Sequence, residues 1–222
     1  MSPTRALLLA AGRGERMRPL TDNVPKPLLS VGGRPLIGWH LAKLAAAGVR
    51  EVAINTSWLA RSLHEALGDG ADYGVSIHWF DEGPEPLESA GGIRNALALF
   101  GDEPFTVVNG DIWTDLPLPP PAPALGKLAH LVLVANPGHH PRGDFAIECG
   151  ELRTTGAVRH TFSGVATYRP ALFRGLAPGR RALRPLLEQA ASAGLVTAEL
   201  YGGRWVDVGT PERLAQLAAA LA

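Results

Sequence analysis

Cysteine is nearly absent from this sequence of 222 residues, which contains only Cys149. A lone cysteine excludes a disulfide within the chain and fits a reducing compartment, so we expect a cytoplasmic protein. Long hydrophobic runs are also lacking. The apolar stretch at residues 6–11 is too short for a secretory signal peptide or a membrane span. The sequence therefore gives no reason to expect a membrane partner.

An excess of one charge is missing as well. The 21 lysines and arginines balance the 21 aspartates and glutamates, so the formal net charge is zero. Domains that bind nucleic acid or anionic membranes usually carry a basic excess. Neither partner is therefore expected on electrostatic grounds. Hydrophobic residues make up 46% of the chain, enough for the core of one large α/β domain.

Two common phosphate-binding motifs are absent too. After residues 6–11 the chain reads Gly-Arg-Gly-Glu-Arg-Met-Arg-Pro-Leu-Thr, from Gly12 to Thr21. The dinucleotide fingerprint requires a third glycine where Met17 stands, and the Gly-Lys-Ser/Thr of a P-loop does not occur. What remains is a loop whose two glycines let backbone N–H groups approach a phosphate. Its three arginines and Lys26 supply the positive charge that a triphosphate requires.

Periodicity and turn residues predict alternating strands and helices. The expected strands cover residues 6–11, 51–55, 75–80, 105–109, 131–135, 164–168, 197–201 and 205–208. The expected helices cover residues 36–47, 58–67, 90–100 and 183–193, and a last one begins at Pro211 with Thr210 as its cap. Residues 136–162 are expected to be irregular, with a short hairpin around Gly150.

This alternation favours an α/β fold with a Rossmann-like, mainly parallel sheet that helices cover on both faces. Ligands of such sheets bind outside the carboxyl ends of the strands. The loop at residues 12–21, the polar loop at residues 81–86 and Asp111 all follow predicted strands. We therefore expect one site to collect them. The proline-rich residues 116–124 are interpreted as an exposed connection.

The stretch at residues 12–27 resembles the signature of the sugar-1-phosphate nucleotidyltransferases. That signature, Gly-x-Gly-x-Arg-x-x-Pro-Leu-Thr followed by Pro-Lys-Pro, is matched at every defined position. The resemblance extends over essentially the whole chain and implies an enzyme that joins a nucleoside triphosphate to a sugar 1-phosphate with Mg²⁺. It implies a single nucleotidyltransferase domain at residues 1–222, without the β-helix of some relatives. Residues 1–115 would be its nucleotide-binding half and residues 125–222 its sugar-phosphate-binding half.

The resemblance also assigns roles to four catalytic residues. Arg16 would hold the leaving β- and γ-phosphates, and Lys26 would lie near the α-phosphate. Asp111 and Asp207 would hold Mg²⁺, which takes one or two carboxylates together with phosphate and water. Either aspartate alone could equally be a turn or cap residue. The implied nucleotide contacts are Ala11, Gly12, Arg13, Gly14, Lys26, Glu82, Gly92 and Asn109.

A second group of residues falls where relatives bind the sugar phosphate. Its members are Glu88, Asn109, Gly143, Asp144, Ser163 and Gly164. Residues 87–93 resemble the family's Leu-Gly-Thr-Ala-Gly-Ala segment, except that Glu88 replaces a glycine. Glu88 is either an acceptor for a sugar hydroxyl or a first-turn residue that suits the helix dipole. The lysine that many relatives carry in a Glu-Lys-Pro context is missing.

Residues 136–145 are compact and, together with the missing lysine, most resemble the uridylyltransferases that act on N-acetylmuramate 1-phosphate in peptidoglycan recycling. UTP and this sugar phosphate are therefore the expected substrates. The lactyl carboxylate of the sugar needs a cationic partner, for which the candidates are His139, His140, Arg142, Arg153, Arg159 and His160. The adjacent His139 and His140 are poorly spaced for one metal ion.

Two alternatives stay open at this point. One is an enzyme for glucose, mannose or N-acetylglucosamine 1-phosphate with dTTP, GTP or UTP. The other is a nucleotide-sensing module without activity, against which the presence of Arg16, Lys26, Asp111 and Asp207 together argues. The sequence leaves the oligomeric state open and is compatible with a monomer.

Overall fold

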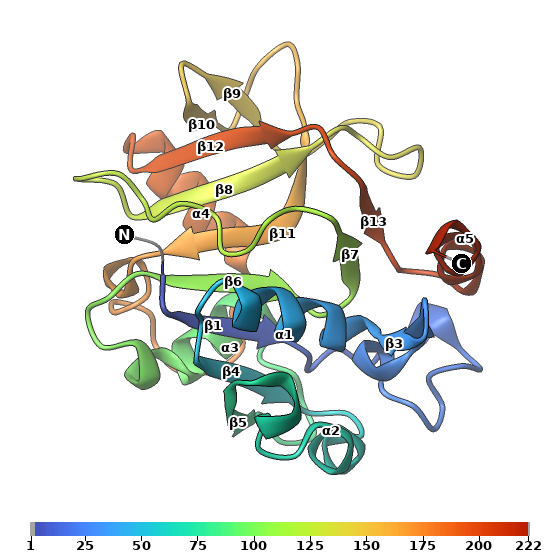
Figure 1. Cartoon of the computed structure of the whole chain (residues 1–222). Helices are drawn as coiled ribbons and strands as arrows, with labels where there is room; N and C mark the ends of the chain where they lie inside the picture. Colours follow the sequence, from blue (N-terminus) through green and yellow to red (C-terminus); the bar gives the residue numbers. More distant parts are fainter. Residues whose placement is uncertain (1–2, 222) are drawn as a thin grey trace. The chain divides into compact units, whose positions relative to one another are not determined.

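The computed structural model describes residues 3–221, which pack as two units (Figure 1). The first, here called the loop unit, consists of residues 4–86, 108–118 and 204–221. The second, the hairpin unit, consists of residues 87–107 and 119–203. The units are therefore not consecutive halves of the chain, because the loop unit is built from three separate segments.

Three parallel strands form the sheet of the loop unit. They are β1 (Arg5–Leu9), β4 (Glu51–Thr56) and β5 (Ser76–Asp81), in the order β5-β4-β1. The middle residues of β1 and β4 are fully buried, which is why both strands read as continuous apolar runs. Helices α1 (Leu36–Ala46) and α2 (Ala60–Leu67) follow the small hairpin of β2 (Ser30–Val31) with β3 (Arg34–Pro35) and strand β4, respectively.

A separate two-stranded ladder belongs to the same unit. It pairs β7 (Ile112–Thr114) with β13 (Trp205–Asp207) in antiparallel orientation, and Asp207 lies opposite Ile112. The last helix, α5 (Pro211–Leu221), follows β13 directly. The ladder thus joins two segments that lie about ninety residues apart in the sequence.

The hairpin unit has a mixed sheet. Its strands are β8 (Ala129–Val134), β9 (Ala146–Glu148), β10 (Glu151–Arg153), β11 (Thr161–Tyr168) and β12 (Val196–Tyr201), in the order β11-β8-β12-β10-β9. Only β8 and β12 run parallel in this set, and the other pairs are antiparallel. Helices α3 (Glu88–Asn95) and α4 (Leu183–Ser192) contact each other in this unit. Strand β6 (Phe105–Asn109) begins in the hairpin unit and ends in the loop unit.

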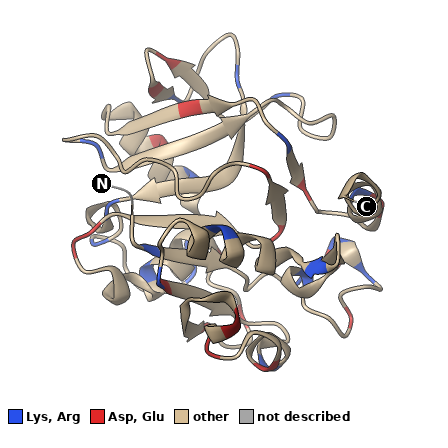
Figure 2. Ribbon diagram, in the orientation of Figure 1, with Lys and Arg blue, Asp and Glu red and all other residues tan. Residues whose placement is uncertain are grey.

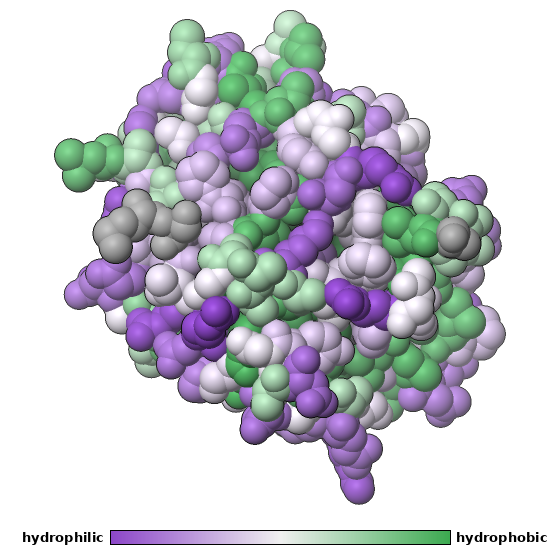
Figure 3. Space-filling view, in the orientation of Figure 1, coloured by the Kyte–Doolittle hydropathy of each residue, from purple (hydrophilic) through white to green (hydrophobic). Residues whose placement is uncertain are grey.

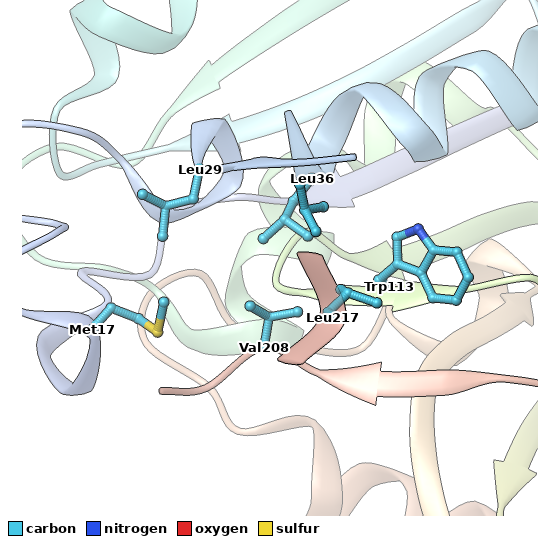
Figure 4. Packing of buried hydrophobic residues seen from close by; sticks show 7 residues of the cluster. Met17, Leu29, Leu36, Trp113, Val208 and Leu217 are labelled. Atoms are coloured by element: carbon cyan, nitrogen blue, oxygen red, sulfur yellow. The ribbon is translucent and has the colours of Figure 1, made fainter. Parts of the chain in front are cut away.

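Seven buried side chains, here called the Met17 cluster, form part of the core of the loop unit (Figure 4). They are Met17, Leu29, Val31, Leu36, Trp113, Val208 and Leu217. Met17 is completely buried and points toward Val208 in Figure 4. Burying a methionine side chain stabilises a fold by roughly 1.5–3 kcal/mol, so this contact holds the loop after β1 against β13 and α5.

The α/β class with a mainly parallel sheet is confirmed, and no β-helix occurs within residues 3–221. Most predicted elements lie within two residues of the observed ones. Two differ. The helix predicted at residues 90–100 is α3, which ends at Asn95, followed by a 3₁₀ turn at Leu97–Phe100. Strand β7 was not predicted, since three residues are too few to show a period.

Acidic and basic residues are both spread over the ribbon and balance to zero net charge (Figure 2), although residues 152–187 contain seven arginines and no acidic residue. On the face drawn in Figure 3, hydrophobic residues occur in separate groups between hydrophilic ones. Among the helices of residues 3–221, none combines the length and the apolar character that crossing a membrane requires.

Candidate active site

The loop after β1 depends on glycine at position 14. Gly14 has φ +65°, in the left-handed region. A Cβ atom on Gly14 would lie 3.0 Å from the Thr21 methyl group and 3.2 Å from Cβ of Lys26. The Thr21 hydroxyl donates a 2.8 Å hydrogen bond to the Gly14 carbonyl. The loop therefore folds back on itself and brings Lys26 beneath it. At Gly12, by contrast, a Cβ would meet nothing within 4 Å, so the chain leaves open space there.

Asn55 connects the start of the loop with the residue after β5. Its side-chain oxygen accepts a 2.7 Å hydrogen bond from the backbone N–H of Ala10. Its amide donates to Glu82 Oε1 at 2.6 Å. Glu82, a predicted nucleotide contact, thus lies beside the loop, whereas the buried Asn55 was missed because its pattern is that of an ordinary strand end.

Two of the three arginines of the loop, Arg13 and Arg16, differ in their contacts. Arg13 donates to the Pro84 carbonyl at 2.9 Å, and its guanidinium lies 6.0 Å from the Trp58 ring. Arg16 is exposed and makes no hydrogen bond or ion pair with another residue of the described range 3–221. Arg13 is therefore fixed by the chain, and the Arg16 guanidinium is available to a phosphate.

Lys26 lies on a 3₁₀ turn (Lys26–Leu28) and is only 6% exposed. Its Nζ contacts Asp111 Oδ2 at 2.6 Å, which supplies the partner that a buried ammonium needs. Gly110 makes this approach possible: its N–H donates to the Leu9 carbonyl at 2.8 Å, and a Cβ there would lie 2.7 Å from the same oxygen. Asp111 therefore follows the end of β6 at the point where β1 ends.

Asp207 reaches the same region through the ladder of β7 with β13. The Val208 N–H donates to the Asp111 carbonyl at 3.0 Å, so the backbones of the two predicted metal ligands are neighbours. Oδ2 of Asp207 accepts a 2.6 Å hydrogen bond from Nη1 of Arg213. Each carboxylate therefore has one oxygen held by a cation of the chain.

This pair of carboxylates fits a hard divalent cation. The side chains of Asp111 and Asp207 are 40% and 23% exposed, so solvent and phosphate can reach them. Within residues 3–221 no three His, Cys, Asp or Glu side chains are grouped as a complete metal site. A metal such as Mg²⁺, which takes few protein ligands and completes its shell with phosphate and water, suits two carboxylates.

Helix α1 braces strand β7, which lies next to Asp111. Nε2 of His40 donates to the Ile112 carbonyl at 2.9 Å, and Nζ of Lys43 donates to the carbonyls of Thr114 and Leu116. Burial lowers the pKa of His40 to about 4, against a smaller opposing effect of the Ile112 hydrogen bond. Burial also lowers the pKa of Lys43. His40 is consequently neutral at pH 7 and serves as a hydrogen-bond donor to the backbone.

In the hairpin unit, Asp144 is the centre of a polar cluster. One carboxylate oxygen accepts from the Phe162 N–H at 2.9 Å. The other contacts Nε2 of His140 and Nη1 of Arg184, each at 3.2 Å. Arg184 was not found from the sequence because it lies on α4, forty residues from Asp144. Asp144 is thus already hydrogen-bonded by the protein, and its structural role is to order these donors.

Three predicted sugar-side residues also have local structural roles. Ser163 donates to the Val132 carbonyl at 2.6 Å and accepts from the Val165 N–H, where the ladder of β11 with β8 shifts register. Gly164 has φ +79° at the same irregularity. A Cβ on Gly143 would lie 2.7 Å from Asn136 Oδ1, so that position has no room for a side chain.

Glu88 begins α3 with φ +60°, in the left-handed region. The family's usual glycine at this position suits a left-handed backbone. Glu88 adopts the same conformation although it is not a glycine. Its carboxylate pairs with Nε of Arg180 at 2.7 Å. The next turn, which includes Gly92, is buried, and the carbonyl of Arg181 accepts from the N–H groups of Ala90 and Gly91.

The basic candidates for the sugar carboxylate differ in how strongly the chain holds them. Arg153 pairs with Glu148 and Glu151 across the hairpin of β9 with β10. Arg159 donates to the Asp144 carbonyl, and His140 to its carboxylate. Arg142 is exposed and has no side-chain partner among residues 3–221.

The predicted residues therefore form two groups. Arg13, Arg16, Lys26, Glu82, Asp111 and Asp207 gather around the carboxyl ends of strands in the loop unit, together with Ala11, Gly12, Gly14 and Asn109. Glu88, Gly92, Gly143, Asp144, Ser163 and Gly164 belong to the hairpin unit.

Comparison with known proteins agrees with this geometry. The nucleotidyl transferase family model matches residues 5–131. The chain belongs to the nucleotidyl transferase family. N-acetylmuramate alpha-1-phosphate uridylyltransferase of Neisseria meningitidis serogroup B is 48% identical to it, over 97% of this chain and 97% of that protein. The enzyme of the same name from Caulobacter vibrioides is 32% identical over 98% and 96% of the two chains.

A solved structure from Bacillus anthracis, assigned as a glucose-1-phosphate thymidylyltransferase, superposes with a TM-score of 0.84. It is 21% identical and covers 98% of this chain and 94% of its own. This likeness shows the fold. The family resemblance drawn from residues 12–27 is thereby confirmed, and the chain is a nucleotidyltransferase similar over almost its full length to the N-acetylmuramate 1-phosphate enzymes.

Proposed function

We propose that this nucleotidyltransferase joins UTP to N-acetyl-α-muramate 1-phosphate, giving the UDP-sugar and pyrophosphate, in the recycling of peptidoglycan. The reaction type rests on two contacts of Asp111. Its carboxylate forms an ion pair with Lys26, and its carbonyl accepts a hydrogen bond from Val208, the residue after Asp207. The two relatives that match almost the full chain support the choice of substrates.

The chemistry is direct attack of the sugar phosphate oxygen on the α-phosphorus of UTP, with pyrophosphate as the leaving group. Such a transfer depends on positioning and on neutralising charge. Arg16, which has no partner within the described chain, holds the β- and γ-phosphates. Lys26 places its positive charge near the α-phosphate, where negative charge grows in the transition state. The open side of Gly12 lets the backbone approach the nucleotide.

Mg²⁺ is the divalent ion that we propose for Asp111 and Asp207. When bound there, it would neutralise phosphate charge and polarise the α-phosphoryl group. The chain's own contribution is to hold the two carboxylates on neighbouring backbones, through the hydrogen bond from Val208 to Asp111. We further propose that the enzyme works in the cytoplasm, where its free and exposed Cys149 would remain reduced.

Sugar selectivity is assigned to the hairpin unit. Arg142 is the proposed partner of the lactyl carboxylate, because the chain leaves its guanidinium without a partner in the described range. Asp144 holds His140 and Arg184 in place around the sugar. One charge-assisted hydrogen bond supplies roughly 1.5–3 kcal/mol. We therefore expect kcat/KM for N-acetylmuramate 1-phosphate to exceed that for N-acetylglucosamine 1-phosphate by about tenfold or more.

The experiment is a matrix of UTP, dTTP, GTP and CTP against four sugar 1-phosphates, scored by pyrophosphate released. UTP with N-acetylmuramate 1-phosphate should be the best pair. Asp111→Asn and Asp207→Asn should lower turnover by about 100-fold or more in a chain that still folds, although each variant leaves a part-buried cation without its anion and should have a lower thermal transition. EDTA should abolish activity and Mg²⁺ should restore it.

Arg142→Ala should reduce the preference for the muramate sugar without changing the KM for UTP. The control is Arg153→Ala, because the guanidinium of Arg153 pairs with two glutamates.

Better turnover of glucose, mannose or N-acetylglucosamine 1-phosphate would contradict the sugar assignment and leave the nucleotidyltransferase standing. Absence of pyrophosphate release with every pair, combined with nucleotide binding, would favour the nucleotide-sensing module.

A further inference from the structure

We propose that Arg213 is the positioning residue that fixes Asp207 for the divalent metal, so that this carboxylate offers one oxygen in a set direction. The inference rests on the proposed function, because it takes Asp207 as a ligand of the metal that binds with UTP. It assigns a role in the reaction to α5, a helix that none of the predicted site residues occupies.

Arg213 contacts Asp207 at two points. Nη1 of Arg213 donates to Oδ2 of Asp207 at 2.6 Å and to the backbone carbonyl of the same residue at 3.0 Å. One guanidinium thus binds both the side chain and the main chain of Asp207, which restrains the χ angles as well as the backbone. The side chains are only 17% and 23% exposed, so solvent screens the pair weakly. Arginine keeps its charge at all accessible pH values, so the restraint is permanent.

Gly209 lies between Asp207 and Arg213 in the sequence and close to both side chains. A Cβ on Gly209 would lie 2.6 Å from Nη2 of Arg213 and 3.0 Å from Oδ1 of Asp207. Gly209 has no positive φ that would demand glycine. The reason for glycine at this position is therefore space for the ion pair.

The start of α5 anchors Arg213. It is the third residue of α5, and its N–H donates to the Thr210 hydroxyl at 3.4 Å. Helical side chains lean toward the N-terminus, which directs Arg213 back to Asp207. Leu217, one turn further along the helix, is 2% exposed in the Met17 cluster together with Val208. The helix that carries Arg213 is thus packed against the residue that follows Asp207.

Asp111 and Asp207 are therefore alike in that a cationic side chain holds one oxygen of each carboxylate. Lys26 holds Oδ2 of Asp111 just as Arg213 holds Oδ2 of Asp207. Mg²⁺ binds carboxylates most often through one oxygen each and demands near-ideal octahedral directions. A carboxylate whose other oxygen is fixed meets that demand without losing rotational freedom on binding. Partners of metal-binding side chains typically change metal affinity by 10–100-fold when they are removed.

The test measures Mn²⁺ binding by electron paramagnetic resonance, in the presence of saturating α,β-methylene-UTP, which cannot be turned over. Arg213→Met should weaken Mn²⁺ binding at least tenfold, and Arg213→Lys should recover part of the loss. Gly209→Ala, which leaves Arg213 in place but displaces its guanidinium, should act in the same direction.

The matched control is Leu217→Ala, which removes a buried side chain from the same helix. A Leu→Ala substitution in a core leaves a cavity, so this variant should have a lower thermal transition. Below that transition its Mn²⁺ affinity should equal that of the wild type.

Unchanged or tighter Mn²⁺ binding in Arg213→Met would overturn the proposal, since tighter binding would mean that Arg213 only opposes the metal by its charge. An equal loss in Leu217→Ala would also overturn it, because any weakening of α5 would then suffice. If the wild type itself fails to bind Mn²⁺ with the nucleotide, the proposed function fails instead.

Discussion

Lys26 and Arg16 represent two environments for a cation within one loop. Lys26 is buried beside Asp111, whereas Arg16 is exposed and has no partner in the described chain. Lys26→Met should therefore lower kcat about 100-fold with a smaller change in the KM for UTP. The positive charge of Lys26 acts at the α-phosphate, where negative charge grows in the transition state. Arg16→Met should raise the KM for UTP and lower kcat as well. Steady-state kinetics with varied UTP measures both.

Stability provides the control for these two variants. Arg16→Met removes no contact of the folded chain, so its thermal transition should match that of the wild type, whereas Lys26→Met leaves Asp111 without its cation. Purely KM effects of equal size in both variants would reduce Lys26 to a binding residue.

Glu88 allows a prediction about backbone strain. A left-handed backbone costs a non-glycine residue roughly 1–2 kcal/mol. The ion pair with Arg180 is largely exposed and contributes about 0–1 kcal/mol. Glu88→Gly should therefore keep or raise the free energy of unfolding, by up to about 1 kcal/mol. Glu88→Ala keeps the strain and loses the ion pair, so it should be less stable than the wild type.

Urea denaturation of the three proteins measures this order directly. If Glu88→Gly proves less stable than Glu88→Ala, the strain at this residue is not what distinguishes them. A gain in stability accompanied by a loss of turnover in Glu88→Gly would favour the first of the two roles considered for Glu88, a direct contact with the sugar.

At the scale of elements, the brace between α1 and β7 should make stability depend on pH. His40 has a pKa of about 4 in the fold against 6.5 in the unfolded chain, because burial disfavours its charged form. At pH values between about 4 and 6.5, the unfolded state therefore binds more protons at His40 than the folded state does. The contribution of neutral His40 is therefore complete above about pH 6.5 and is lost as the pH falls toward 4. The full loss is on the order of 3 kcal/mol.

The measurement is the free energy of unfolding at pH 7, 6 and 5 for the wild type and for His40→Gln, which keeps a donor for the Ile112 carbonyl. Carboxylates titrate in both proteins, so the difference between the two slopes isolates His40. The wild type should lose more stability than the variant over this range. Parallel slopes would show that His40 does not titrate in the way its burial requires.

Elements also decide how much the sequence could predict. The loop at residues 12–21 and strand β1 were predictable because a long local pattern specifies them. The Asp207–Arg213 pair was not, because it depends on how β13 ends and α5 begins. Asn55 was missed for a similar reason, since its partners Ala10 and Glu82 come from two other segments. Local periodicity carries no information on such contacts. The assignment of residues 87–107 to the hairpin unit likewise depends on packing between distant segments.

For the whole molecule, the balance of charges predicts its solubility. The sequence pI is about 7.1, and the molecule therefore carries almost no net charge at neutral pH. Proteins without net charge repel one another least and associate most readily. The concentration of polyethylene glycol that precipitates the protein should be lowest near pH 7 and should rise toward pH 8.5. A monotonic dependence through pH 7 would mean that apolar surface, and not charge, limits solubility.

The composition of the Met17 cluster also sets the order of events during biosynthesis. Val208 is made roughly 190 residues after Met17, which at about 5–20 residues per second is a delay of roughly 10–40 seconds. Until Val208, Leu217 and Arg213 have been added, the loop lacks its packing partner and Asp111 lacks its neighbouring carboxylate. The hairpin unit is itself complete only at residue 203, five residues before Val208, so at this rate Val208 follows the last residue of the hairpin unit within about one second. The nascent chain therefore acquires its catalytic residues as a set only once Asp207 has been made, roughly 190 residues after Arg16.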